Sequence, residues 1–265
     1  MSIVDYETQD GIATITLNRP ESLNSMNAGL MGGLSECFAQ VEADQDVRVV
    51  VLTGAGRGFC SGADLAEMGD GGEAGTEVVR GDVMAEVFNP AIQAIANCPV
   101  PTICRINGVA AGGGFGLAMA CDISIAARSA FFVATFGPRL GIVPDLGTSW
   151  HLPQRVGAAR ARGIAMLGGR ISADQAAEWG LIWEVVDDQD LDVAVDEVAQ
   201  VLKRSSPSAM TRIRNAMAAA EHNTLAEQLD LEHRHQVVLI PANMIEGAKA
   251  FVEKRDPVFS PTREK

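Results

Sequence analysis

The chain has 265 residues, of which 47% are hydrophobic, and it carries a formal net charge of −13 at pH 7. Nucleic acid and anionic membrane surfaces both require clustered lysine and arginine, so this acidic balance argues against either partner. The length and apolar content suffice for one large domain with an appendage. We expect no signal peptide, because the N-terminal MSIVDYETQD is acidic, and no membrane span, because the most apolar stretch, residues 106–121, is short and glycine-rich.

Strand-like and helix-like segments alternate through the first half of the chain. Leu30, Leu34, Phe38 and Val41 recur at helical spacing, which predicts an amphipathic helix. The order of elements predicts α/β layers. The expected helices are residues 27–43 and 89–97, and the expected strands are residues 12–17, 47–53, 102–106, 122–127 and 130–134.

The composition changes after residue 172, where helix-start signals become frequent. Ser172 with Gln175 and Thr224 with Glu227 have capping-box spacing, and Pro207 follows Ser206 as a first-turn proline would. Helices should therefore dominate the last quarter. Their apolar residues would be exposed in a monomer, which predicts subunit association; these are Leu225, Leu229, Leu231, Val237, Val238 and Leu239.

Five cysteines form an odd set without a C-x-x-C pair, and none of the four histidines lies at zinc-ligand spacing. We expect reduced, mostly buried thiols in a cytoplasmic protein, and no metal site. The cysteines are Cys37, Cys60, Cys98, Cys104 and Cys121.

Two glycine-broken turns each follow a strand-like segment. The first is RGFCSGADL, residues 57–65, and the second is the glycine cluster in PTICRINGVAAGGGFGLAMA, residues 101–120. A helix start presents free backbone N–H groups and the positive end of the helix dipole, which suit a developing oxyanion. One N–H from each turn, near Ala63 and Gly113, would form an oxyanion hole, each donor being worth about 3 to 4 kcal/mol. The alternative for either turn is close backbone packing between strand and helix. Neither turn completes a dinucleotide fingerprint or a P-loop.

Taken together, FCSGADL and NGVAAGGGFGLAMACD resemble the crotonase, or enoyl-CoA hydratase/isomerase, superfamily. The likeness runs from LNRPESLNSMN, residues 17–27, through LGGRISADQAAEWGLIWEVV, residues 167–186, to the terminal AFVEKRDPVF. It implies an α/β fold, a crotonase-like spiral of ββα turns, with a C-terminal helical oligomerisation region. Residues 1–200 would form the spiral core and residues 201–265 the trimerisation region. It further implies an acyl-CoA enzyme whose thioester oxygen lies between the N–H groups of Ala63 and Gly113.

The resemblance also implies how coenzyme A is held. The last helix of one subunit would lend Phe251 and Lys254 to the nucleotide of a neighbour in a homotrimer or hexamer, although a solvated basic tail that includes Arg255 is the alternative. Coenzyme A enters as part of the substrate, and no separate cofactor is expected. For Asp64, one of the predicted contacts named below, the alternative is a role as the N-terminal cap of the next helix. The residues predicted to contact coenzyme A or the acyl chain are Arg19, Arg57, Ser61, Gly62, Asp64, Leu65, Gly112, Gly137, Phe251 and Lys254.

Hydratases that resemble this chain hold a water between two glutamates, and the matching positions here are Gly116 and Gly137. Water addition by two carboxylates is therefore unsupported. Asp145 remains, in GPRLGIVPDLGTSW, where similar isomerases have an aspartate. The context is similar to bacterial ring-1,2-epoxyphenylacetyl-CoA isomerases in LTGAGRGFC, INGVAAG and IAARSAFFV. A single carboxylate can move a proton next to a stabilised enolate if burial raises its pKa. Alternatively, Asp145 caps the helix that starts near Gly147.

Other side chains near the predicted site fit structural roles better. Cys60 suits a core thiol more than a nucleophile, and Asp122 suits a structural hydrogen bond. Glu86 is a reserve base beside a glycine-rich acidic stretch, residues 69–77, that could form a lid over the acyl pocket and that has Glu67 and Asp82 near it.

Several functions remain open at this point. The favoured one is an acyl-CoA isomerase that shifts a double bond or rearranges an epoxyphenylacetyl-type thioester with Asp145 as the base. The alternatives are a hydratase-like enzyme, a thioester dehalogenase or hydrolase with an aspartate nucleophile, and a non-catalytic acyl-CoA binder. The second alternative calls for a histidine in the helix at 89–97 and a tryptophan within residues 136–138, and the sequence has neither.

Overall fold

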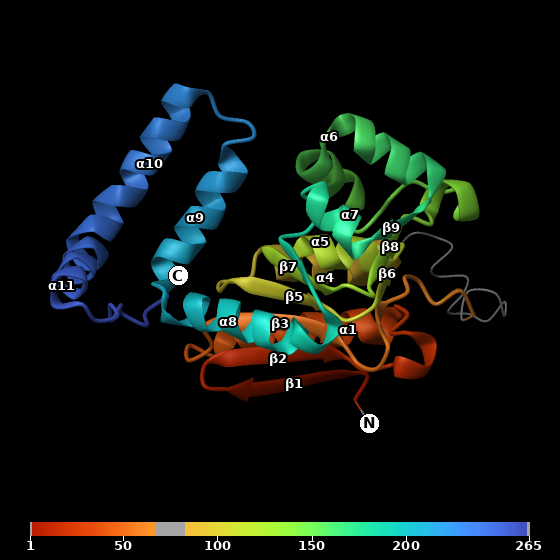
Figure 1. Cartoon of the computed structure of the whole chain (residues 1–265), viewed down its shortest axis with the longest axis horizontal. Helices are drawn as coiled ribbons and strands as arrows, with labels where there is room; N and C mark the ends of the chain where they lie inside the picture. Colours follow the sequence, from red (N-terminus) through yellow and green to blue (C-terminus); the bar gives the residue numbers. More distant parts are fainter. Residues whose placement is uncertain (1, 67–82, 264–265) are drawn as a thin grey trace.

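The computed structural model describes residues 2–66 and 83–263. Its larger sheet has six strands in the order β1-β2-β3-β5-β7-β10 (Figure 1). β1 and β2 form an antiparallel pair, and every later neighbour is parallel. The strands are β1 (Val4–Gln9), β2 (Ile12–Leu17), β3 (Val49–Gly54), β5 (Thr102–Ile106), β7 (Ile123–Ala127) and β10 (Glu184–Val186).

A smaller sheet has four strands in the order β4-β6-β8-β9, and only β9 is antiparallel to its neighbour. Along the chain β3 is followed by β4, β5 by β6, and β7 by β8, so each pair gives one strand to each sheet. This alternation is the spiral of ββα turns that the sequence resemblance implies, and it confirms the expected fold. The strands are β4 (Gly58–Cys60), β6 (Val109–Ala111), β8 (Phe131–Val133) and β9 (Arg170–Ser172).

Helices pack against both sheets: α8 contacts β3, β5 and β7 of the larger sheet, and α5 contacts β4 and β6 of the smaller one (Figure 1). In α1 the four apolar residues selected by helical spacing are all buried, and the Asn27 side chain accepts the Leu30 N–H at 2.9 Å. All eight residues of α5 are buried, because its glycine- and alanine-rich sequence lets the surrounding backbone approach closely. The helices of this part are α1 (Ala28–Ala43), α4 (Asn89–Ala96), α5 (Gly113–Ala120), α6 (Thr148–Leu167), α7 (Ala173–Glu178) and α8 (Leu191–Arg204).

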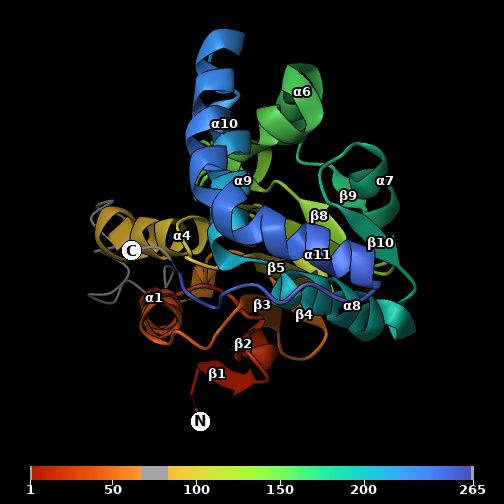
Figure 2. The same cartoon turned by 90° about the vertical axis from the view of Figure 1, so that its left-hand side faces the viewer.

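The C-terminal helices α9 (Pro207–Ala219), α10 (Leu225–Leu239) and α11 (Ile245–Glu253) extend away from the sheets (Figures 1 and 2). The predicted capping boxes at Ser172 and Thr224 are both present, and Pro207 occupies the first turn of α9. α10 buries none of its own side chains within the chain. Helix α8 continues through residue 200 to Arg204, and the division into a core and a trimerisation region stays a prediction.

All five cysteines are buried and free, as expected. Across the described residues, no helix combines the length and the apolar character that a bilayer-spanning segment requires.

Candidate active site

The first glycine turn positions the Ala63 N–H. Gly62 has φ +94°, which a glycine adopts without strain. The Met26 N–H donates to the Gly62 carbonyl at 2.7 Å, and the Asp64 N–H donates to the Met26 carbonyl at 2.9 Å. Because neighbouring residues of an extended segment point their amides to opposite sides, the Ala63 N–H faces away from Met26.

The second glycine turn opens α5. Gly112 has φ +52°, its N–H donates to the Val133 carbonyl at 2.9 Å, and its own carbonyl accepts the Phe115 N–H at 2.9 Å. Gly113 is the first helical residue, and an N–H at that position has no acceptor within its helix. A Cβ atom placed on Gly62 would lie 3.5 Å from the Gly112 Cα, so the two turns are in direct contact. The two proposed oxyanion donors therefore belong to adjoining turns.

Asp145 lies on the turn that precedes α6, and its side chain does not cap that helix. The N-terminal cap of α6 is Gly147, with no side-chain hydrogen bond, and the Thr148 N–H donates instead to the backbone carbonyl of Asp145 at 2.8 Å. The cap interpretation is therefore wrong. Among the described residues, the buried Oδ1 atom of Asp145 has no hydrogen-bond partner. Burial raises the pKa of Asp145 to about 6, although its own backbone N–H partly offsets this effect.

The turn that contains Asp145 packs against α5 through the following residue, Leu146. Leu146 is only 4% exposed. A Cβ atom placed on Gly113 would lie 2.6 Å from Leu146 Cδ1, and one placed on Gly116 would lie 2.6 Å from the Leu146 carbonyl oxygen. The two glycines thus allow the turn to approach the start of α5. The predicted base, Asp145, is therefore the chain neighbour of the residue that contacts the predicted oxyanion donor Gly113.

His151 also adjoins this turn, and sequence reasoning missed it. A Cβ atom on Gly147 would lie 3.2 Å from His151 Cδ2 and 3.8 Å from Ile92 Cγ2 of α4. Burial lowers the pKa of His151 to about 4, with the charge of Arg155 as a smaller cause, so the ring is neutral near pH 7. The four-residue spacing from Gly147 was the available signal, because it places the ring over the glycine once α6 begins there.

The other candidate groups have structural or surface positions. Asp122 accepts hydrogen bonds from the Thr102 N–H at 2.8 Å and the Thr102 hydroxyl at 3.0 Å, which confirms its structural role. Burial raises the pKa of Cys60 to about 12, as in an inert core thiol. Glu86 is exposed. Glu67, Asp82 and the predicted lid at residues 69–77 lie outside the described residues.

Several predicted coenzyme A contacts near the first turn have partners within the chain. Arg19 pairs with Asp64 at 2.8 Å, and the Ser25 hydroxyl donates to the same carboxylate at 2.9 Å. Ser61 donates through its hydroxyl to the Ser22 carbonyl at 3.0 Å. An arginine that already faces a carboxylate contributes little positive potential to a phosphate. The alternative in which Asp64 caps the next helix falls largely on residues 67–82, which lie outside the described residues.

The remaining predicted contacts are at the surface. Arg57, Gly137 and Lys254 are exposed, Leu65 is 54% exposed and Phe251 is 86% exposed. Lys254 ends α11 with φ +52°. Arg255 differs from its neighbour because it pairs with Glu246 at 2.6 Å and Glu253 at 2.7 Å.

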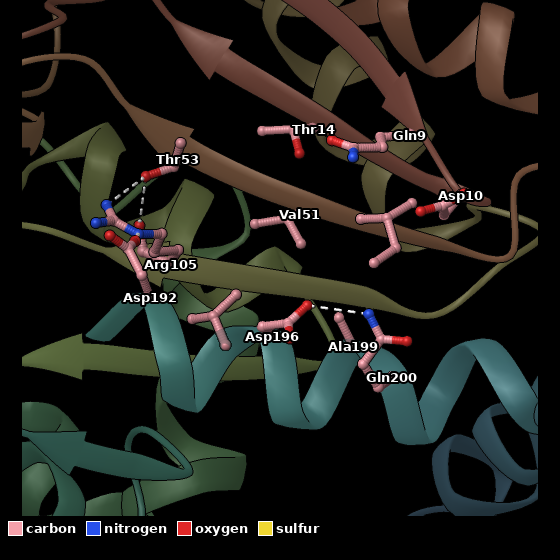
Figure 3. A pocket seen from close by; sticks show the side chains of 12 residues that line it. Gln9, Asp10, Thr14, Val51, Thr53, Arg105, Asp192, Asp196, Ala199 and Gln200 are labelled. Atoms are coloured by element: carbon pink, nitrogen blue, oxygen red, sulfur yellow. Dashed lines mark hydrogen bonds and ion pairs between the residues drawn. The ribbon is translucent and has the colours of Figure 1, made fainter. Parts of the chain in front are cut away.

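Two surface clefts lie elsewhere. One of about 490 Å³ is bounded by β2, β3, β5 and α8 (Figure 3). There Arg105 pairs with Asp192 at 2.7 Å, and Asp10 and Asp196 add further negative charge, which does not suit the phosphates of coenzyme A. The other, of about 710 Å³, lies between β1 and α1. Neither lining includes Ala63, Gly113 or Asp145. Within residues 2–66 and 83–263, no three potential ligand side chains gather to hold a metal ion.

Comparison with known proteins agrees with this geometry. The profile of the family described as Enoyl-CoA hydratase/isomerase matches residues 7–262. The chain is 44% identical to the 1,2-epoxyphenylacetyl-CoA isomerase of Escherichia coli (strain K12), covering 98% of this chain and 99% of the relative. It is 42% identical to a probable enoyl-CoA hydratase of Rhodobacter capsulatus, covering 97% of each.

Solved structures show the same fold. The crystal structure of an enoyl-CoA hydratase from Bacillus anthracis superimposes with a TM-score of 0.90 at 33% identity, covering 98% of this chain and all of the other. An enoyl-CoA hydratase from Polaromonas sp. JS666 gives a TM-score of 0.89 at 31% identity and covers 97% of this chain and 99% of the other. The paired glycine turns, the spiral and these matches along nearly the whole chain show that the protein belongs to the enoyl-CoA hydratase/isomerase, or crotonase, family.

Proposed function

We propose that the protein is an acyl-CoA isomerase in which Asp145 is the base and the N–H groups of Ala63 and Gly113 form the oxyanion hole. The observation that carries this proposal is the buried Oδ1 atom of Asp145, which has no hydrogen-bond partner among the described residues and belongs to a turn whose next residue, Leu146, packs against Gly113. A carboxyl group with a pKa of about 6 is mostly ionised at pH 7.5 and still accepts a proton readily.

The reaction needs one proton to leave a carbon and one to return. The Asp145 carboxylate removes a proton from the substrate α- or γ-carbon, and the electron pair of the broken C–H bond moves onto the thioester oxygen. The enolate oxygen accepts hydrogen bonds from Ala63 and Gly113, whose fixed donors lower the barrier. The protonated Asp145 then returns its proton to another carbon, and the thioester carbonyl re-forms. The net change is an isomerisation that shifts a double bond; in an epoxyphenylacetyl-type thioester the same proton transfer would accompany opening of the epoxide-bearing ring, in which the C–C bond of the epoxide breaks, its electron pair enters the ring double bonds, and no atom is gained or lost.

The residues at two positions, both glycines, favour isomerisation over hydration. Gly116 and Gly137 occupy the places of the two water-holding glutamates, and neither offers a carboxylate. The relatives carry both kinds of name, an isomerase at 44% identity and a probable hydratase at 42%. A likeness of that size does not choose between the two reactions, so the choice rests on the side chains.

The dehalogenase or hydrolase alternative is less well supported. It requires a histidine from α4 as a base, and the α4 sequence NPAIQAIA contains none. The π-helical turn Phe136–Leu140, FGPRL, contains no tryptophan. A non-catalytic binder would have no use for a desolvated carboxylate beside the oxyanion donors, because the burial costs stability without adding affinity for a neutral acyl chain.

We also propose that the active assembly is a homotrimer or hexamer. Its exposed apolar helices support this, since Leu229, Val237, Ile245 and Phe251 are each at least half exposed in the single chain. In that assembly Lys254 and Phe251 of one subunit would contact the nucleotide of a neighbour, and Arg57 would add a local cation. The five buried free thiols suit a reducing compartment, and we propose the cytoplasm.

A panel of acyl-CoA thioesters tests the proposed function. The panel includes a 3-enoyl thioester, a 2-enoyl thioester and an epoxyphenylacetyl thioester, and calorimetry measures binding separately from turnover. We expect isomerisation of at least one member, slow hydration of the 2-enoyl thioester and exchange of a substrate proton in deuterated water. Efficient hydration would refute the isomerase assignment, and binding of every thioester without turnover or exchange would identify a binder.

A further inference from the structure

The residue after the proposed base makes two contacts that no sequence signal predicts. Leu146 is buried, with its Cδ1 beside Gly113 and its carbonyl oxygen beside Gly116. Gly113 and Gly116 are three residues apart on α5 and therefore lie on one face of that helix. One leucine thus spans the helix face that begins at the oxyanion donor.

Leu146 also has an unusual backbone conformation. Its φ is +48°, in the left-handed region that non-glycine residues seldom adopt, and Gly147 follows with φ +77°. Strain of this kind persists where the surroundings fix it, and it occurs preferentially at functional sites. Here the surroundings are the glycine face of α5, because a larger residue at position 113 or 116 would collide with Leu146.

The space above Gly116 is completely taken. A Cβ atom there would lie 2.6 Å from the Leu146 carbonyl oxygen, 2.7 Å from Thr148 Oγ1 and 3.2 Å from Leu146 Cβ. Thr148 is fully buried, so this wall is closed to solvent. A second carboxylate, or a water held by one, therefore has no room at this position while the turn keeps its present place.

We propose that Leu146 is a positioning residue that fixes the Asp145 carboxylate relative to the Gly113 N–H. Together with Gly116, it also excludes a second carboxylate and the water that such a group would hold from this face of α5. The inference rests on the proposed isomerase function. It adds a reason why the enzyme would transfer a proton without adding water. The enolate carbon meets a single base, and the surface beside that base is the backbone and side chain of Leu146, which cannot hold a water molecule for attack.

The test compares five substitutions in the full-length protein. Leu146→Ala removes the contact with Gly113, and Gly116→Ala pushes the turn away from α5. The matched controls are Leu34→Ala, which empties an equally buried site in α1, and Gly163→Ala on α6, where an added Cβ meets nothing within 4 Å. Leu146→Met conserves volume and should restore most of the function lost in Leu146→Ala.

Three measurements are made on each variant: the affinity for an acyl-CoA thioester, the rate of substrate proton exchange in deuterated water at saturation, and the Asp145 titration by carbon NMR, assigned with Asp145→Asn. We expect Leu146→Ala and Gly116→Ala to bind with at most threefold weaker affinity but to exchange about 10- to 100-fold more slowly, because displacement of a base by about 1 Å has that effect. In Leu146→Ala water enters, so the Asp145 pKa falls toward its ordinary value. Both controls should match the wild type.

The outcomes separate this inference from the proposed function. If the two turn variants match their controls in exchange rate and in the Asp145 titration, Leu146 has no positioning role. A loss of affinity as large as the loss of exchange would assign Leu146 to substrate binding instead and also overturn the inference. If the wild type exchanges no proton of any thioester, the proposed function fails, and the Asp145 titration in Leu146→Ala still decides whether Leu146 holds the carboxylate in its buried position.

Discussion

Replacement of Asp145 by asparagine should remove activity and increase stability together. As the base, Asp145 contributes about 100-fold or more to proton transfer, so isomerisation and proton exchange should fall by at least that factor while thioester binding persists. Asparagine is nearly isosteric and carries no charge. It should therefore keep the turn while relieving the desolvation that the carboxylate suffers.

The size of the stability gain follows from the pKa. Burial raises the Asp145 pKa from 3.8 to about 6, which corresponds to about 3 kcal/mol between the two protonation states. A group whose pKa is higher in the folded state contributes its full stability below the unfolded value and loses it as the pH rises through the folded value. The wild type therefore loses stability between pH 3.8 and about pH 6, and Asp145→Asn does not.

Denaturant unfolding of both proteins at equal concentration measures this difference. We expect Asp145→Asn to be more stable by about 2 to 3 kcal/mol at pH 7.5 and by close to nothing near pH 4. Loss of a helix cap would instead lower the stability by about 0.5 to 2 kcal/mol. A destabilised variant, or a gain that does not depend on pH, would refute the assignment of a desolvated carboxylate at this turn, and full retained activity would refute its role as the base.

The remaining predictions concern pH, the oxyanion donor, the missing glutamate and assembly. Isomerase activity should rise with pH through about 6 as Asp145 ionises, and a pH–rate profile without an acid limb near that value would contradict this. Gly113→Pro should lose the oxyanion N–H and about 100- to 1,000-fold in kcat in a steady-state assay, whereas Gly113→Ala, which keeps the N–H but displaces Leu146, should lose no more than Leu146→Ala does. Gly116→Glu should gain no hydratase activity, because its Cβ would lie 2.6 Å from the Leu146 carbonyl oxygen; rapid hydration of a 2-enoyl thioester would show that the wall yields. Light scattering at micromolar concentration should give the mass of a trimer or hexamer, and a strictly monomeric mass would overturn the assembly.

The elements with a local signal were predicted well. The strands at Ile12–Leu17 and Thr102–Ile106 have the expected bounds, because alternation or a continuous apolar run distinguishes them from their surroundings. α1 begins one residue after its expected start, since Asn27 is the cap rather than the first helical residue. The expected strand at 47–53 is shifted to Val49–Gly54, where it pairs in register with its neighbours.

The elements without a local signal were missed. β1, Val4–Gln9, has apolar residues only at Val4 and Tyr6, so its alternation is too short to distinguish a strand from an acidic N-terminal segment. β4, β6 and β9 have three residues each, which is too short for any periodicity to be read. They exist because successive turns of the spiral bring them side by side, and such pairing depends on contacts that are distant in sequence.

The site shows the same division between local and long-range information. Glycine at positions 62, 112 and 113 indicated tight turns, but that the two turns meet is a long-range contact that only the resemblance implied. An aspartate after proline and before a helix fits both a cap and a base. The structure separates these roles, because the Thr148 N–H donates to the backbone carbonyl of Asp145 and the carboxylate Oδ1 has no hydrogen-bond partner among the described residues.

The strain in this turn explains why these features occur together. The left-handed Leu146 costs about 1 to 3 kcal/mol, and the desolvated Asp145 costs a similar amount at neutral pH. Together they consume a large part of the 5 to 15 kcal/mol that stabilises a typical domain. In a turn without a function, neither cost would be retained: a glycine at position 146 would remove the backbone strain, and a side chain at position 145 that capped α6 would remove the desolvation. A mutation toward either relaxed state should raise stability, so the presence of both costs on the neighbouring residues 145 and 146 supports the proposal that Asp145 acts as the base, with its buried Oδ1 free to take a proton.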